Sequence, residues 1–151
     1  MRRSRPLWQV FLPATLAFFV AAGCGSGPGG ERAASPQIIR TKAGDATVVN
    51  VLRTKSLAGG YYHAPAGSTI LVVYLRPQVR SQRQSLINLL GHSAASGKGK
   101  IYVVDSAGKR ANIELGGLLE GRLLMAFVTP QTERTFKLFM PGEPSLTLTA
   151  K

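Results

Sequence analysis

Few residues in this sequence combine the types and the spacing that chemistry requires. Cys24 is the sole cysteine, so the chain can form neither an intrachain disulfide nor a cysteine-based zinc site. The two histidines, His63 and His92, would hold a metal only together with a carboxylate, and nothing in their spacing indicates such a site. We therefore predict no enzymatic activity, no metal and no cofactor. The alternative is a small metal-assisted or serine hydrolase that uses His92.

The stretch Gly91–Lys100 (GHSAASGKGK) comes close to a phosphate-binding loop. It has one residue too many between its first two glycines, and Gly99 stands where such a loop needs Ser or Thr. A Ser/His/Asp triad that uses His92 would be expected together with a GxSxG motif and an alternation of strands and helices, and the sequence has neither. The sequence therefore predicts a polar loop here.

The first residues of the chain have the order of an export signal. Met1–Arg5 is basic, Leu7–Val20 is apolar, and Ala21-Ala22-Gly23 follow as small residues. Basic, apolar and small regions in this order are typical of a secretory signal peptide. The apolar stretch is shorter than the roughly 20 residues that a membrane-spanning helix needs.

The string Val20–Cys24 (VAAGC) resembles the lipobox of bacterial lipoproteins, in which small residues precede an obligatory cysteine. The resemblance implies a diacylglyceryl thioether on Cys24 and cleavage of the bond before it. Residues 25–37 are rich in Gly, Ser and Pro, which is typical of flexible coil. We expect residues 1–23 to be a lipoprotein signal peptide, 24–37 the lipidated Cys24 and a tether, and 38–151 one domain. An ordinary cleaved signal peptide and an uncleaved membrane span are the alternatives.

From Ile38 onward, short apolar runs alternate with turn residues at intervals of about ten residues, which is typical of an antiparallel β-sandwich. Ser85–Leu90 fits either a strand or one helical turn, and almost no other helix is expected. The fold class is therefore all-β, with seven to eight strands. The other predicted strands are Ala46–Thr54, Ser68–Val79, Lys100–Asp105, Arg110–Leu115, Gly121–Val128, Thr135–Met140 and Ser145–Ala150.

The apolar pattern also predicts which residues face the core. Ile70–Leu75 is apolar at every position, as expected of a central strand that is covered on both faces. The tetrapeptide at residues 106–109 (SAGK) predicts a hairpin in which Gly108 takes a positive φ. Alternation along the flanking strands places Ala111, Ile113 and Leu115 on one face. The predicted core contains Val73, Ile101, Phe127, Phe136 and Leu138.

Three stretches, at residues 64–77, 100–111 and 116–139, resemble a domain-of-unknown-function family of bacterial lipoproteins. The resemblance implies an immunoglobulin-like β-sandwich whose fold is related to the mycobacterial immunoprotective extracellular antigen. The family pattern contains a "D-x-x-G" hairpin, an "AFxxP" strand and an "FKL" strand. The matching residues here are Asp105, Gly108, Ala126, Phe127, Pro130 and Leu138. The family has no established activity, so the resemblance implies a fold and a location only.

The formal net charge of the chain is +12. Without Arg2, Arg3 and Arg5 of the export signal, 16 basic residues remain against 7 acidic ones, a net charge of about +9. Such an excess favours anionic surroundings. If loops at one end of the sandwich gather part of it, they form one patch for an anionic partner. The alternative is that the basic residues are scattered over the whole surface. The candidate patch consists of Arg76, Arg80, Arg83, Lys98 and Lys100.

These features predict a lipid-anchored binding module on the extracytoplasmic face of the cell membrane, or of an outer membrane if the envelope has two. The expected partners are the membrane, through the lipid on Cys24, and an anionic lipid, wall polymer or acidic protein at the basic patch. Nucleic acid is not an expected partner, because an exported protein rarely meets it. The sequence does not name the ligand.

Overall fold

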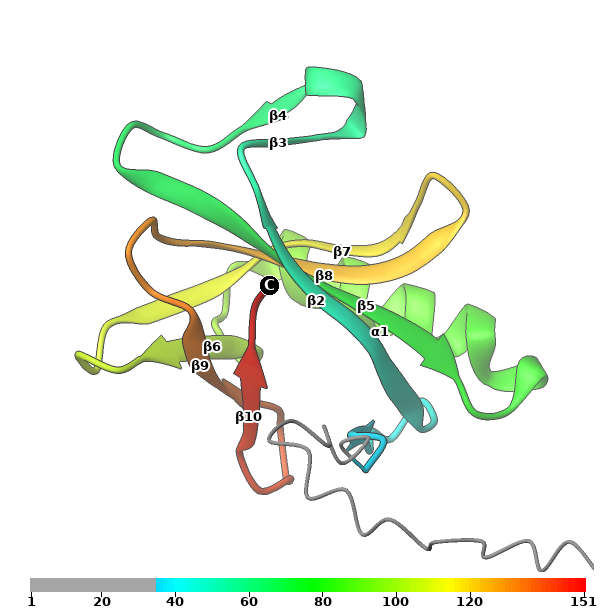
Figure 1. The fold of residues 1–151 in the computed structure, drawn as a ribbon. Coiled ribbons are helices and arrows are strands. Elements are labelled where there is room, and N and C mark those ends of the chain that lie inside the picture. Colours follow the sequence, from blue (N-terminus) through cyan, green and yellow to red (C-terminus); the bar gives the residue numbers. More distant parts are fainter. Residues whose placement is uncertain (1–34) are drawn as a thin grey trace, which may run out of the picture. The chain divides into compact units, whose positions relative to one another are not determined.

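The computed structural model describes residues 35–151, so the predicted signal peptide, Cys24 and most of the predicted tether lie outside the described residues. The described chain is all-β and sandwich-like, as the sequence predicted (Figure 1). Within it, the α-helix α1 is neither long nor apolar enough to cross a membrane. The elements are β1 (Ile38–Ile39), β2 (Ala46–Thr54), β3 (Ser56–Leu57), β4 (Tyr62–His63), β5 (Ser68–Pro77), α1 (Arg83–Ser96), β6 (Tyr102–Asp105), β7 (Arg110–Leu119), β8 (Arg122–Pro130), β9 (Thr135–Phe139) and β10 (Leu146–Thr149), with short 3-10 helices at Ala58–Gly60 and Arg80–Gln82.

Eight strands form one antiparallel, curled sheet in the order β1-β2-β5-β8-β7-β6-β9-β10, and β3 and β4 form a separate hairpin. Strand β7 connects the two halves of the sandwich, because its first residues pair with β6 and its later residues pair with β8. A bulge between Ile113 and Leu115 marks the change of partner. Bulges of this kind let one strand turn a corner between two packed sheets.

The main core fills the space between the two halves of the sheet. Phe127 and Val73 reach it from β8 and β5, while Phe136 and Leu138 reach it from β9. Together with Ile101, these are the five residues that the sequence predicted to be buried together, and all five lie in this cluster. The prediction of the core is therefore confirmed.

Strand β5 has apolar neighbours on both faces, as predicted. Leu71 and Val73 lie in the main core, whereas Ile70 and Val72 lie in a second, smaller cluster that the β3–β4 hairpin helps to cover. The prediction for β7 is wrong at Leu115, which packs against the smaller cluster rather than the main core. The β7 bulge is the reason, because one extra residue reverses the side to which later side chains point.

The β6–β7 hairpin is formed as predicted, with Gly108 at a φ of 81°. Asp105 stabilises it from within: its carboxylate oxygen Oδ1 accepts hydrogen bonds from the backbone N–H groups of Ala107 at 3.0 Å and Lys109 at 2.8 Å. Asp105 is only 8% exposed. Its role in the structure is therefore to hold the turn.

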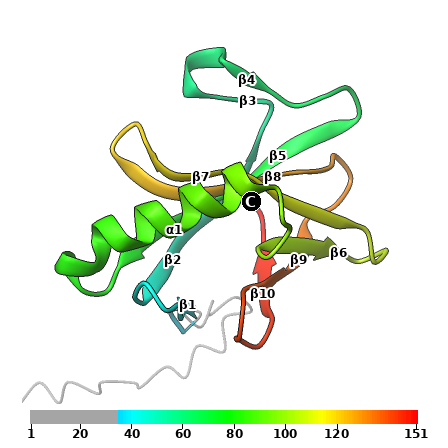
Figure 2. The same ribbon diagram turned by 180° about the vertical axis from the view of Figure 1, so that it is seen from behind.

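The sequence prediction at Ser85–Leu90 is wrong in extent, because this segment belongs to α1, a helix of 14 residues. Leu86 and Leu90, four residues apart, point into the main core. The helix lies along β7 (Figure 2), and Gly116 of β7 makes the close approach possible. A Cβ at Gly116 would lie 2.5 Å from the carbonyl oxygen of Leu90.

Candidate anion-binding pocket

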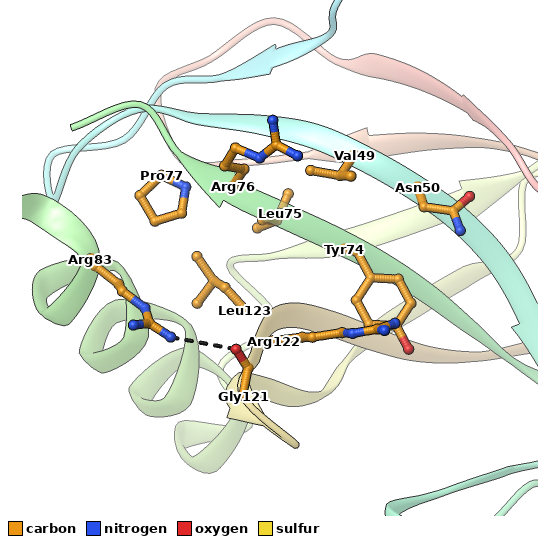
Figure 3. A pocket seen from close by; sticks show the side chains of 10 residues that line it. All are labelled: Val49, Asn50, Tyr74, Leu75, Arg76, Pro77, Arg83, Gly121, Arg122 and Leu123. Carbon is orange, nitrogen blue, oxygen red and sulfur yellow. Dashed lines mark hydrogen bonds between the residues drawn. The ribbon is translucent and has the colours of Figure 1, made fainter. Parts of the chain in front are cut away.

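A pocket of about 440 Å³ opens at the end of the sheet where β5 stops and α1 begins (Figure 3). Three arginines surround it: Arg76 from β5, Arg83 from the first turn of α1, and Arg122 from the start of β8. We call these three residues and the space between them the arginine pocket. The other lining residues are Val49, Asn50, Tyr74, Leu75, Pro77, Gly121 and Leu123.

Local backbone features place each arginine. Arg76 stands one position before Pro77, the last residue of β5, which pairs with β2 but has no partner on β8. Proline lacks the backbone N–H that continues a ladder, so the strand ends there. The chain then turns through the short 3-10 helix into α1, whose first residue is Arg83.

Arg122 is placed by the tight turn between β7 and β8. Leu119 pairs with Arg122, which leaves Glu120 and Gly121 as a two-residue turn. Both turn residues have a positive φ, 49° and 76° respectively, as a type I′ hairpin turn requires. The turn directs Arg122 across Tyr74, and its guanidinium carbon lies 5.4 Å from the centre of the Tyr74 ring.

A bulge in β2 shapes the remaining side of the pocket. The pairing of β2 with β5 shifts between Val48 and Asn50, which leaves Val49 without a partner in the ladder and half exposed. Val49 and Asn50 therefore reach the rim of the pocket. Bulges often redirect side chains beside binding sites.

The charge in this pocket is of one sign. Within residues 35–151, its lining contains three guanidinium groups and neither Asp nor Glu. Arg83 donates one hydrogen bond from Nη2 to the carbonyl oxygen of Gly121, at 3.4 Å. A guanidinium remains charged at any pH that proteins meet, and its planar set of donors matches carboxylate and phosphate oxygens. The pocket therefore has the chemistry to hold such an anion.

The structure brings together only some of the predicted patch residues. Arg76 and Arg83 line the arginine pocket, whereas Arg80 is exposed on the 3-10 helix and is not among the lining residues. Lys98 and Lys100 follow the opposite end of α1, and a 14-residue helix spans about 21 Å. The basic residues thus form two regions rather than one.

Sequence reasoning missed Arg122 as a member of the site. Its local signal was the Glu120-Gly121 dipeptide between two apolar runs, which indicates a tight hairpin. That signal does not show which part of the chain lies beside the hairpin. The proximity of Arg122 to Tyr74 follows from the pairing of β5 with β8, in which Tyr74 is opposite Leu124.

Both histidines, His63 and His92, are exposed in the described part of the chain. There, no group of three His, Cys, Asp or Glu side chains is close enough to hold a metal ion. His92 shares a hollow with Ser93 and Ser96, but their hydroxyls donate to the carbonyl oxygens of Leu89 at 2.7 Å and Ser93 at 3.2 Å. No Asp or Glu of residues 35–151 lines this hollow.

The surroundings of Tyr62 make its phenol less acidic. Burial in the β3–β4 hairpin raises the pKa of the Tyr62 phenol, and the negative charge of Glu114 adds to this rise. The phenol therefore stays protonated at neutral pH, and its role is to cover the smaller apolar cluster.

The comparisons with known proteins give no match among family models, curated proteins or solved structures. The resemblance to a family of bacterial lipoproteins therefore stays a prediction from the sequence.

Proposed function

We propose that this protein is a non-enzymatic binding module of the cell envelope, held at the membrane by a lipid on Cys24. In this proposal the arginine pocket is its binding site, and the partner presents a phosphate or carboxylate. The observation that carries the proposal is the set of three arginines around one pocket whose described lining contains no carboxylate. The lipid anchor rests on the lipobox-like string at residues 20–24.

Positive side chains around one concave surface raise the local concentration of anions. Arg76, Arg83 and Arg122 are all exposed, so a ligand can reach them without a change of fold. Exposed charges are screened beyond about 8 Å at physiological salt, so the affinity for an anion falls as salt rises.

Co-sedimentation with vesicles tests the proposal. The chain from Ala33 onward, which forms one compact unit with its own core, is mixed with phosphatidylglycerol vesicles or with neutral phosphatidylcholine vesicles. We expect sedimentation with the anionic vesicles at low salt, and loss of it as salt is raised. Replacing Arg76, Arg83 and Arg122 with Gln is expected to weaken binding at least tenfold.

A charge-matched control keeps the test specific. Lys109, Arg134 and Lys137 are exposed and outside the arginine pocket, so replacing these three with Gln removes the same net charge. The proposal requires that this control variant retain most of the binding. Equal losses in both triple variants would show that only the total charge matters.

A further inference from the structure

A second hollow of about 290 Å³ lies where the last two turns of α1 meet the segments that follow β1, precede β6 and follow β9. We call it the lysine hollow, after Lys42, Lys98 and Lys100 in its lining. It shares no lining residue with the arginine pocket.

The inner wall of the lysine hollow is apolar. Ile101 and Met140, which are 1% and 8% exposed, belong both to the main core and to this wall. Leu89 of α1 and Pro141 complete the apolar surface. An apolar group that enters here would contact the core itself, and burying each methylene contributes about 0.8 kcal/mol.

The mouth of the hollow is cationic. All three lysines are exposed, and they come from two separate segments of the chain. Within the described residues no carboxylate lines the hollow. Ammonium groups gathered without a counter-charge repel one another, so an anion among them is favourable. Lysine stems can also lie along apolar surface while their charged ends stay in water.

Two glycines constrain the backbone of the loop that carries Lys98 and Lys100. Gly97 ends α1 in the left-handed conformation, at a φ of 59°, and Gly99 has the same value. A Cβ at Gly99 would lie 2.5 Å from Nη2 of Arg110. Lys98 is therefore held between two positions where other residues are strained.

The end of α1 opposes an anion only weakly. The carbonyl groups at a helix C-terminus carry partial negative charge, and their effect on a neighbouring charge is about 0.3–1 kcal/mol. Three full positive charges outweigh this effect. The hydroxyls of Ser93 and Ser96 already donate to backbone carbonyls, so the side chains left to donate to a bound headgroup are the lysines, together with His92.

We propose that the lysine hollow binds a fatty acid. The acyl chain lies against Leu89, Ile101 and Met140, and the carboxylate lies among Lys42, Lys98 and Lys100. The apolar wall favours a fatty acid over a small soluble anion. The lysines favour it over an amphiphile with an uncharged headgroup. This proposal uses none of the three pocket arginines, so it stands or fails independently of the proposed function.

Isothermal titration calorimetry with decanoate tests the proposal on the compact unit from Ala33 onward. Octanoate should bind more weakly than decanoate by about fourfold for each missing methylene, because each contributes about 0.8 kcal/mol. Replacing Lys42, Lys98 and Lys100 with Gln is expected to weaken decanoate binding at least tenfold. The same variant should bind decyl maltoside, which has an uncharged headgroup, as the unmodified protein does.

The charge-matched variant, with Gln at positions 109, 134 and 137, is the control. Retention of decanoate binding by this control, together with a shift of the Met140 methyl signal in NMR spectra, supports the site. Affinity that does not depend on chain length would overturn the proposal. Equal loss of affinity in both triple variants would also overturn it, as would loss only when Arg76, Arg83 and Arg122 are replaced.

Discussion

The contact between α1 and β7 makes the substitution Gly116→Ala a demanding test of the structure. The new Cβ would lie 2.5 Å from the carbonyl oxygen and 2.8 Å from the carbonyl carbon of Leu90, and 2.9 Å from Cδ1 of Ile113. Two of these three atoms belong to helix backbone, so no side-chain rotation can relieve the overlap. The helix as a whole must shift.

The expected cost follows from the general behaviour of overpacked contacts. Inserting a methyl group into a filled interface destabilises a protein by about 1–3 kcal/mol. In a domain of this size, each kcal/mol lowers the melting temperature by roughly 4 °C. We therefore expect a free energy of unfolding about 2 kcal/mol lower for Gly116→Ala, measured by urea denaturation and circular dichroism.

Gly91 offers a matched control on the helix side of the same contact. A Cβ at Gly91 would lie 3.4 Å from the carbonyl oxygen of Gly116, at the edge of ordinary contact. Alanine is favoured over glycine inside a helix by about 0.8–1 kcal/mol. Gly91→Ala should therefore leave the stability unchanged or raise it. A Gly116→Ala variant as stable as the unmodified protein, or a Gly91→Ala variant with the larger loss, would refute this description of the contact.

Substitutions at three other positions test separate features of the molecule. Cys24→Ser should abolish lipidation and leave unprocessed precursor, and equal labelling of both proteins by a palmitate analogue would contradict this. Asp105→Ala should lower the free energy of unfolding in urea denaturation by about 1–3 kcal/mol, because the backbone N–H groups of Ala107 and Lys109 lose their acceptor. Asp105→Asn, which keeps an acceptor oxygen, should lower it less. Glu120→Gly should raise the melting temperature slightly, because a positive φ costs an L-residue about 1–2 kcal/mol, and an unchanged or lower value would show that the turn is not strained.

Local patterns in the sequence predicted most of the sheet correctly. The predicted strand Ala46–Thr54 has the same bounds as β2, and the Ser106–Lys109 turn forms with Gly108 at a positive φ. Both depend on neighbouring residues alone: alternation or apolar runs define strands, and turn chemistry defines hairpins. The same holds for the core, because the apolar side chains on one face of a strand are stabilised by burial against the other strands.

The errors arise where distant contacts decide the structure. α1 lacks an acidic first turn and a side-chain N-cap, and glycine and several serines interrupt its sequence. Its stability comes instead from Leu86 and Leu90 in the main core and from the glycine contact with β7. The i, i+4 spacing of these two leucines was the signal that a longer helix begins there.

The candidate site was predictable only in part, for the same reason. Arg76 and Arg83 are seven residues apart, and the position where β5 ends indicated that both lie near the same end of the sheet. Arg122 joins them only because β5 pairs with β8, a contact between residues about fifty positions apart. Lys98 and Lys100 were assigned to the same patch because the length of α1 was not foreseen.

The central claim is that the arginine pocket holds an anion, and a titration followed by NMR tests it most directly. Inorganic phosphate is added to the ¹⁵N-labelled chain from Ala33 onward, and the side-chain Nε–Hε signals of the arginines are recorded. We expect saturable shifts for Arg76, Arg83 and Arg122, with little change for Arg80 and Arg134, which lie outside the pocket. Shifts of the same size for all arginines, or none for the three in the pocket, would contradict it.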